Sequence, residues 1–264
     1  MMRYVLPAFT VGLVAVILVD RARRPASVQA SGVPAALAAT PAAMAPAGRD
    51  LSPPTARTAP APAPASATPT LDRLARLAVR QQLGREAGAT YLDSLLASTD
   101  SVVRRWPDLV SPLKVALVEG GPVDYSPHLA ALFRQALARW TDAGVGVRFT
   151  EVPDTGSADI VVHWIDRFDF DRAGQTDLTW DQQGRVRRAA VSLALRTSTG
   201  VTFNDAALLA VAVHEAGHAI GLPHSPDSND VMFPSTRTAG LSARDIRTAL
   251  VLYQLPPGSV RDPR

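Results

Sequence analysis

The sequence predicts an α+β fold, and three features of its second half indicate this class. Two short β-branched runs flank a helical pattern, which gives a β-α-β order over residues 113–152. Residues 174–195 have the composition of two strands joined by a turn. Helical patterns follow at 205–220 and 242–253. This order of elements is typical of helices layered on a sheet.

The N-terminal residues 1–24 predict a signal peptide or a signal anchor. Arg3 precedes an apolar run, residues 4–19, which is shorter than the roughly 20 residues that span a bilayer as a helix and fits a signal-peptide core. Ala30 offers a small residue at a cleavage position, but three arginines lie between it and the apolar run. Cleavage and membrane anchoring through residues 4–19 both stay open. Either one predicts export, to a secreted or periplasmic location or to the outer side of the cytoplasmic membrane.

Two segments separate this N-terminus from the compact part of the chain. Residues 25–70 are rich in Ala, Pro, Ser and Thr, and they lack the apolar side chains of a core, so we expect a disordered linker. Residues 71–97 have apolar positions at helical spacing, which Gly84 and Gly88 weaken. We interpret residues 71–104 as a helical pro-region or as a brace for the following domain, and the sequence does not decide between them.

The composition excludes several kinds of function. The chain has no cysteine, so disulfides, cysteine-ligated zinc and thiol catalysis are ruled out. The 27 Lys and Arg residues exceed the 24 Asp and Glu residues only slightly, and they form no dense basic stripe with aromatic residues between them. We therefore expect no nucleic-acid partner.

Residues 105–256 are predicted to form one domain, followed by a tail at 257–264. Ser126 and Pro127 are a capping pair that begins a helix, which Gly144 and Gly146 close. The apolar face of this helix consists of Leu129, Leu132, Phe133, Ala136, Leu137 and Trp140. Strands are predicted at 113–118, 147–152, 158–165, 174–180 and 185–195.

Residues 214–224 carry the strongest chemical signal, with the sequence HEAGHAIGLPH. His214 and His218 are four residues apart, so their rings project from one face of a helix, where two imidazoles can bind one ion. Glu215 is adjacent but is not directed as a ligand. Gly221 can adopt the left-handed conformation that ends the helix, and this turn brings His224 back as a third ligand.

Three neutral imidazoles leave a fourth coordination position for water, which is typical of a catalytic zinc site rather than a structural one. We therefore predict one zinc ion held by His214, His218 and His224. Glu215 is the predicted catalytic residue: it acts as general base toward the zinc-activated water and then as general acid toward the leaving amine. A helix that carries histidines without any metal is the alternative, but five fixed positions match by chance in only about 1 chain in 10⁴.

These residues resemble the metzincin clan of zinc endopeptidases and, within it, the matrixin family. Ser225 after the third histidine and Met232 in VMFP (231–234) are similar to the family's residues there, Met232 in its Met-turn. Residues 241–253 resemble the family's closing helix. The resemblance implies a metzincin-like catalytic domain with a twisted, mostly parallel five-stranded sheet, an antiparallel edge strand and three helices. It also implies that Asp245 hydrogen-bonds the Met-turn backbone.

The resemblance further implies how a substrate binds. A peptide would lie extended along the edge strand, residues 174–180. The side chain after the cut would enter a pocket beside the zinc. Ala210, one turn before His214, would form its floor, and one wall would consist of Phe233, Pro234 and Ser235. A small floor residue predicts a deep apolar pocket.

The chain also departs from the family pattern. Without a cysteine, the prodomain switch of the animal members cannot operate. His128 and His163 are the other histidines of this region, and each is better explained as a surface or core histidine than as a ligand of a second zinc. Calcium stays open as a second cofactor because hard oxygen ligands suit it. The loop aspartates that could supply them are Asp166, Asp169, Asp171 and Asp177.

The function that follows is hydrolysis of internal peptide bonds by a zinc-dependent endopeptidase, acting as a monomer on a protein or peptide substrate. Two other classes stay open. One is a zinc hydrolase of a non-protein substrate, since the motif specifies the metal and base but not the acyl group. The other is a non-catalytic envelope-binding protein that keeps a relic zinc site.

Overall fold

The computed structural model describes residues 68–94 and 101–261, apart from 108 and 110. The predicted signal segment 1–24 and the predicted linker up to residue 67 lie outside the described residues. Within the described part, no helix combines the length and the apolar character that crossing a bilayer requires.

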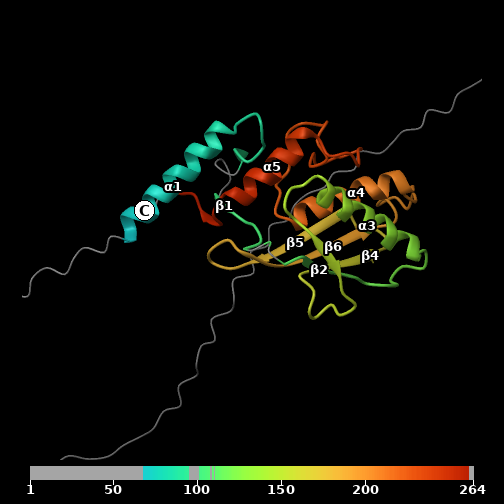
Figure 1. The fold of residues 1–264 in the computed structure, drawn as a ribbon. Coiled ribbons are helices and arrows are strands. Elements are labelled where there is room, and N and C mark those ends of the chain that lie inside the picture. The colour runs from blue at the N-terminus through green and yellow to red at the C-terminus, as the bar shows by residue number, and fades with distance from the viewer. Residues whose placement is uncertain (1–67, 95–100, 108, 110, 262–264) are drawn as a thin grey trace, which may run out of the picture.

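A five-stranded sheet forms the centre of the domain. Its strands are β2 (Leu113–Leu117), β3 (Phe149–Glu151), β4 (Ile160–Ile165), β5 (Gly174–Trp180) and β6 (Val186–Ala194). They lie in the order β3-β2-β4-β6-β5. The first four run parallel, while β5 pairs antiparallel with β6 and forms an edge. This arrangement confirms the predicted fold class, including the antiparallel edge strand (Figure 1).

Three helices accompany this sheet, as predicted: α3 (Pro127–Asp142), α4 (Asp205–Ala219) and α5 (Ala243–Gln254). Helix α4 packs on β5 and β6, and α3 packs beside α4. Trp140 on α3 is fully buried, and its indole N–H donates to the Val213 carbonyl oxygen of α4 at 2.9 Å. Every residue of the predicted apolar face of α3 is buried.

Side chains alternate between the two faces of the sheet along each strand, and one face is buried more deeply than the other. On β4, Ile160, Val162 and Trp164 belong to the main apolar core, whereas Val161 points to a small cluster on the opposite face and His163 is exposed. The covered face therefore supports α4, which carries His214, Glu215 and His218 of the predicted metal centre and packs against α3.

The N-terminal helix is shorter than the sequence predicts. Helix α1 runs over Thr68–Arg85, whereas the apolar spacing predicted a helix over 71–97. Gly88 has a φ of 81°, a left-handed conformation that a continuing helix cannot adopt. The chain therefore turns after α1, and Tyr91 and Leu92 enter the core.

The two ends of the domain are paired, which the sequence did not predict. Strand β1 (Val102–Val103) forms an antiparallel pair with β7 (Gly258–Ser259), a segment predicted only as a tail. Gly184, in the β5–β6 turn, lies against both strands: a Cβ atom there would come within 2.5 Å of the Val103 carbonyl oxygen and 2.8 Å of the Gly258 nitrogen.

Gly221 ends α4 as the sequence predicts. Its φ is 101°, its N–H donates to the His218 carbonyl oxygen at 2.8 Å, and the Leu222 N–H reaches back to Gly217 at 3.0 Å. A Cβ atom at this position would lie 2.6 Å from the Arg104 carbonyl oxygen. The turn that leads toward His224 therefore requires glycine for its conformation and for its close approach to another segment.

We predict that Gly221→Ala lowers the free energy of unfolding by more than about 2 kcal/mol, because the left-handed conformation alone costs about 1–2 kcal/mol and the clash with Arg104 adds to it. Urea unfolding of the metal-free protein measures the effect. Gly84→Ala is the matched control: its Cβ meets open space within α1. We expect it to change stability by less than about 1 kcal/mol, toward greater stability. Equal effects of the two substitutions would contradict the assignment.

Candidate metal centre

Helix α4 positions three of the predicted functional side chains, and the turn at Gly221 positions the fourth. His214, Glu215 and His218 lie in the last turns of α4 and are almost fully buried, while His224 follows the turn and is half-buried. Asn204 caps the start of the helix by accepting from the Ala207 N–H at 2.9 Å.

The three histidine rings converge. The Nε2 atom of His218 lies 3.0 Å from Nε2 of His214 and 3.2 Å from Nε2 of His224. Within the part of the chain that the structure describes, these histidines form the set of His, Cys, Asp or Glu side chains that could share one ion. The spacing is close to the roughly 3.4 Å that separates two nitrogens bound to one tetrahedral zinc at about 2.0–2.1 Å.

Backbone carbonyls fix which ring nitrogen carries the proton. His214 Nδ1 lies 2.7 Å from the Val231 carbonyl oxygen, and His218 Nδ1 lies 2.8 Å from that of Leu222. A carbonyl oxygen can only accept, so both Nδ1 atoms donate. In a neutral ring the Nε2 atom then presents a lone pair, and two such lone pairs face each other across 3.0 Å. Only a proton or a metal cation between them removes this repulsion.

Burial favours a metal ion over a proton in this position. It lowers the pKa of His214 to about 3 and that of His224 to about 4, and the pKa of His218 falls well below its usual value for the same reason. The rings are therefore neutral near pH 7, the form in which imidazole binds zinc. The donor set, three neutral nitrogens with two of them oriented from behind, fits a catalytic zinc ion.

Glu215 is fully buried beside the histidines, and one of its carboxylate oxygens has no partner. Thr176 on β5 donates to Oε2 at 2.6 Å, whereas Oε1 makes no hydrogen bond within the described structure. Burial raises the pKa of Glu215 to about 8, which the Thr176 hydrogen bond and the charge of Arg172 partly oppose. The positive charge of a zinc ion held by the neighbouring histidines would lower this pKa, and Oε1, which has no donor, could then accept a proton from water.

Three residues of this site were missed from the sequence: Thr176, Arg172 and Gly174. The guanidinium of Arg172 is buried against Phe168 and Phe170, and its Nη1 donates to the Gln175 side chain, while its Nε and Nη2 have no partner among the described residues. Gly174 lies against Glu215, because a Cβ atom at this position would come within 2.6 Å of Glu215 Cγ. The sequence signal for it was a glycine at the first residue of a predicted strand, where glycine often marks the close approach of another group.

Met232 packs against the ligand-bearing helix, and its role as the methionine of a Met-turn stays a prediction. Its side chain is fully buried, and a Cβ atom at Gly217 would collide with its sulfur. The preceding Val231 accepts from His214, and the Met232 carbonyl oxygen accepts from the Ser225 N–H at 2.8 Å. The turn thus contacts α4 and the segment after the third histidine at once.

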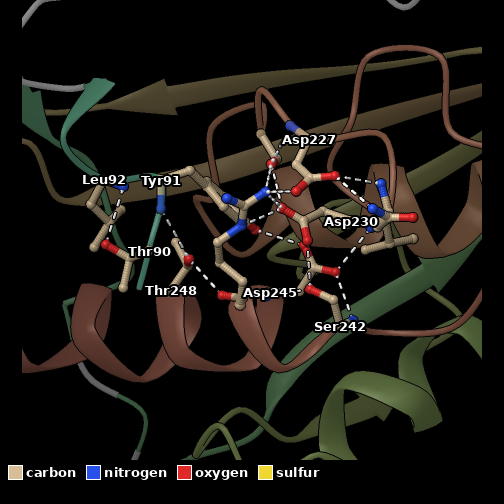
Figure 2. Close-up of polar contacts among 12 residues, drawn as sticks. Thr90, Tyr91, Leu92, Asp227, Asp230, Ser242, Asp245 and Thr248 are labelled. Carbon is tan, nitrogen blue, oxygen red and sulfur yellow. Dashed lines mark hydrogen bonds and ion pairs between the residues drawn. The ribbon is translucent and has the colours of Figure 1, made fainter. Parts of the chain in front are cut away.

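A polar network that includes residues of α5 holds the turn around Val231 and Met232 on the side away from α4 (Figure 2). The Val231 N–H donates to Asp245 Oδ2 at 2.9 Å, which is the hydrogen bond expected for Asp245. Asp230 accepts from Ser242 at 2.7 Å and from Arg244 at 2.7 Å, and it also accepts from the Ser225 hydroxyl. Helix α5 therefore fixes both ends of the segment between Ser225 and Met232.

The predicted substrate-pocket residues lie on two different elements. Ala210 is buried on α4, one turn before His214. The residues of the predicted wall, Phe233, Pro234 and Ser235, are half-buried just after Met232. The pocket that they would enclose stays a prediction.

The loop aspartates do not gather into a set of ligands among the described residues. Asp166 pairs with Arg196 at 3.2 Å, and both carboxylate oxygens of Asp177 accept from Gln175 at 2.9–3.0 Å. His128 lies on the surface with its Nε2 2.7 Å from Asp205, and His163 is exposed on β4. The structure gives no support for the open calcium site.

The amino-acid sequence of the chain is similar to those of known metalloproteinases. The chain is 31% identical over 135 residues to a macrophage metalloelastase from Rattus norvegicus, covering 47% of this chain and 29% of the relative. It is 30% identical over 159 residues to metalloendoproteinase 1-MMP from Arabidopsis thaliana, covering 53% of this chain and 43% of the relative. A metalloendoproteinase 1 from Glycine max is 29% identical over 160 residues, with 50% and 48% covered.

The chain spans less than half the length of these curated relatives. The matrixin family profile matches residues 120–254, a range that contains the sheet from β3 onward, the three histidines, Glu215 and all of α4 and α5. The chain therefore belongs to the matrixin family.

Proposed function

We propose that this protein is a zinc-dependent endopeptidase that hydrolyses internal peptide bonds of proteins, with His214, His218 and His224 as zinc ligands and Glu215 as general base and acid. The observation that carries the proposal is the arrangement of lone pairs. Three neutral imidazole nitrogens converge, and beside them lies a buried carboxylate with one oxygen unpartnered. The family and the names of its relatives, among them metalloendoproteinases, support a protein substrate.

The residues of the chain divide the chemistry between them. A zinc ion, when bound, polarises the scissile carbonyl and makes water acidic enough to be deprotonated near neutral pH. Glu215 receives that proton on Oε1 and passes it to the leaving amine nitrogen. Thr176 holds the other carboxylate oxygen, Oε2, and so leaves Oε1 without a competing donor beside Gly174. The Nδ1 hydrogen bonds of His214 and His218 keep the Nε2 ligand atoms directed at the same point during the reaction.

Strand β5 is the element that best fits a bound polypeptide. It forms one edge of the sheet, so one side of its backbone is available to pair with an extended chain. Gly174 and Thr176, two of its residues, contact Glu215. A peptide added along this edge would therefore pass beside the catalytic carboxylate, and main-chain hydrogen bonds would hold it without reading its sequence.

The expected cellular setting rests on the sequence alone. The apolar segment 4–19 supports export, either with cleavage or with retention as an anchor, and the catalytic domain would then act outside the cytoplasm as a monomer.

We predict that Glu215→Gln in the full chain keeps one zinc ion and lowers casein cleavage by about 10²–10⁴-fold, because general base catalysis is lost while the ligands stay intact. Metal analysis and a casein assay, run on the same preparation, measure both quantities. His218→Ala serves as the comparison, since it should lose zinc and activity together. If wild type with one zinc ion cleaves no protein, the chain is a binder or acts on another substrate.

We predict that Gly174→Ala lowers kcat/KM about a hundredfold with zinc retained. A Cβ atom there would lie 2.6 Å from Glu215 Cγ and 2.8 Å from its Cδ, so the carboxyl group must move, and a displacement of about 1 Å can cost that factor. Gly156→Ala is a control on an exposed turn, where only the Asp154 carboxylate is close, at 3.2 Å. If both variants keep wild-type kcat/KM, catalysis does not depend on the position of the Glu215 carboxyl group beside Gly174, and this prediction is wrong.

We predict that Ala210→Arg shifts cleavage toward smaller side chains after the cut, because the larger residue would fill the floor of the proposed pocket. Mass spectrometry of a digested peptide library gives the cleavage profile. The zinc content of the variant shows whether the site is intact. A variant that keeps its zinc and cleaves with the wild-type profile would rule out the pocket assignment.

A further inference from the structure

Residues 68–94 lie outside the region that matches the family, yet they pack on the domain as part of its core. Val79 and Leu83 of α1, together with Tyr91 and Leu92 after it, are buried in the same apolar cluster as α5 residues such as Leu252. Tyr91 is 1% exposed and Leu92 is completely buried. Figure 1 shows α1 as a helix apart from the sheet, with α5 between them.

Polar contacts fasten this segment to one face of α5. Glu86 forms a two-bond ion pair with Arg247 at 2.6 and 3.0 Å. The Tyr91 N–H lies 3.4 Å from the hydroxyl of Thr248, which itself donates to the Arg244 carbonyl oxygen at 2.7 Å. The ion pair is exposed and contributes little, whereas the contacts of Tyr91 are buried and more costly to break.

The Tyr91 hydroxyl reaches the carboxylate that holds the Met-turn. It donates to Asp245 Oδ1 at 3.1 Å, while Oδ2 accepts from the N–H groups of Val231 and Ser242, each at 2.9 Å (Figure 2). Burial and the charge of Asp245 raise the pKa of Tyr91 well above its usual value, so the phenol stays protonated as a donor. Asp245 is itself fully buried, and its carboxylate has donors at both oxygens.

The same contacts continue to a metal ligand. Val231 donates its N–H to Asp245 and accepts with its carbonyl from His214 Nδ1 at 2.7 Å. A short path of hydrogen bonds thus runs from Tyr91 through Asp245 and Val231 to His214. Each link is buried, where hydrogen bonds are less screened by water.

We propose that Tyr91 is a positioning residue of the metal centre, acting through Asp245 and Val231 on His214, and that residues 68–94 are a retained brace of the active enzyme and not a removable pro-region. The proposal rests on the proposed zinc site. Loss of this segment would uncover apolar core on α5 and leave Asp245 Oδ1 without a donor. Both effects disfavour an active form that lacks the segment.

The test uses the full chain and compares two tyrosines that each lose only a hydroxyl. Tyr91→Phe removes the donor to Asp245. Tyr253→Phe removes a donor from the other end of α5, where the hydroxyl bonds the Ile220 carbonyl oxygen at 2.8 Å and does not reach Asp245. Zinc affinity is measured by competition with a chelator well below the unfolding temperature, and thermal unfolding of the metal-free proteins is recorded beside it.

We expect Tyr91→Phe to weaken zinc binding about three- to tenfold. This is at or below the lower end of the effect of losing a direct partner of a ligand, because Tyr91 lies two residues beyond Val231, the direct partner of His214. Tyr253→Phe should lose comparable stability with zinc affinity unchanged. Equal zinc affinities in wild type and Tyr91→Phe, or equal weakening in both variants, would overturn the proposal. A protein that binds zinc but cleaves nothing would refute the peptidase function without touching this result.

Discussion

The structure depends on the way two backbone carbonyls hold two buried imidazoles. Because Val231 and Leu222 each accept from an Nδ1 atom, His214 and His218 are locked with their Nε2 lone pairs toward a common point. This arrangement is unfavourable for neutral rings alone and becomes favourable when a cation sits between them. Folding therefore already orders the ligand side chains, so that metal binding does not have to supply the free energy of ordering them. The repulsion between the lone pairs is relieved only when the cation binds.

The two carbonyls are positioned in different ways. Leu222 follows the left-handed turn at Gly221, so its position comes from local chain geometry. Val231 belongs to a turn that Gly217 admits under the helix and that Asp245 holds from α5. One ligand orientation is therefore a local property of the motif, and the other requires the packing of the whole C-terminal half.

The division between local and distant contacts also explains what the sequence could predict. The proximity of His214 and His218 was predictable because residues four apart lie on one face of a helix, and Glu215 is their neighbour in the chain. The strand and helix patterns predicted each main element of the domain to within a few residues. Thr176 was missed because it reaches Glu215 across 39 positions. Tyr91 was missed for the same reason, since 154 positions separate it from Asp245. The end of α1 was misplaced because the apolar period continued past Gly88, where the backbone turned.

The pairing of β1 with β7 has a practical consequence for anyone who isolates this domain. Val260 also donates its N–H to the Ser101 carbonyl oxygen at 2.9 Å, so the entry and exit of the catalytic unit are hydrogen-bonded side by side. A fragment trimmed to the family match would lack both strands and the cover over Gly184. Protein engineers should therefore choose expression boundaries that keep the two ends together, and the closeness of those ends makes the unit suited to insertion into another protein's surface loop.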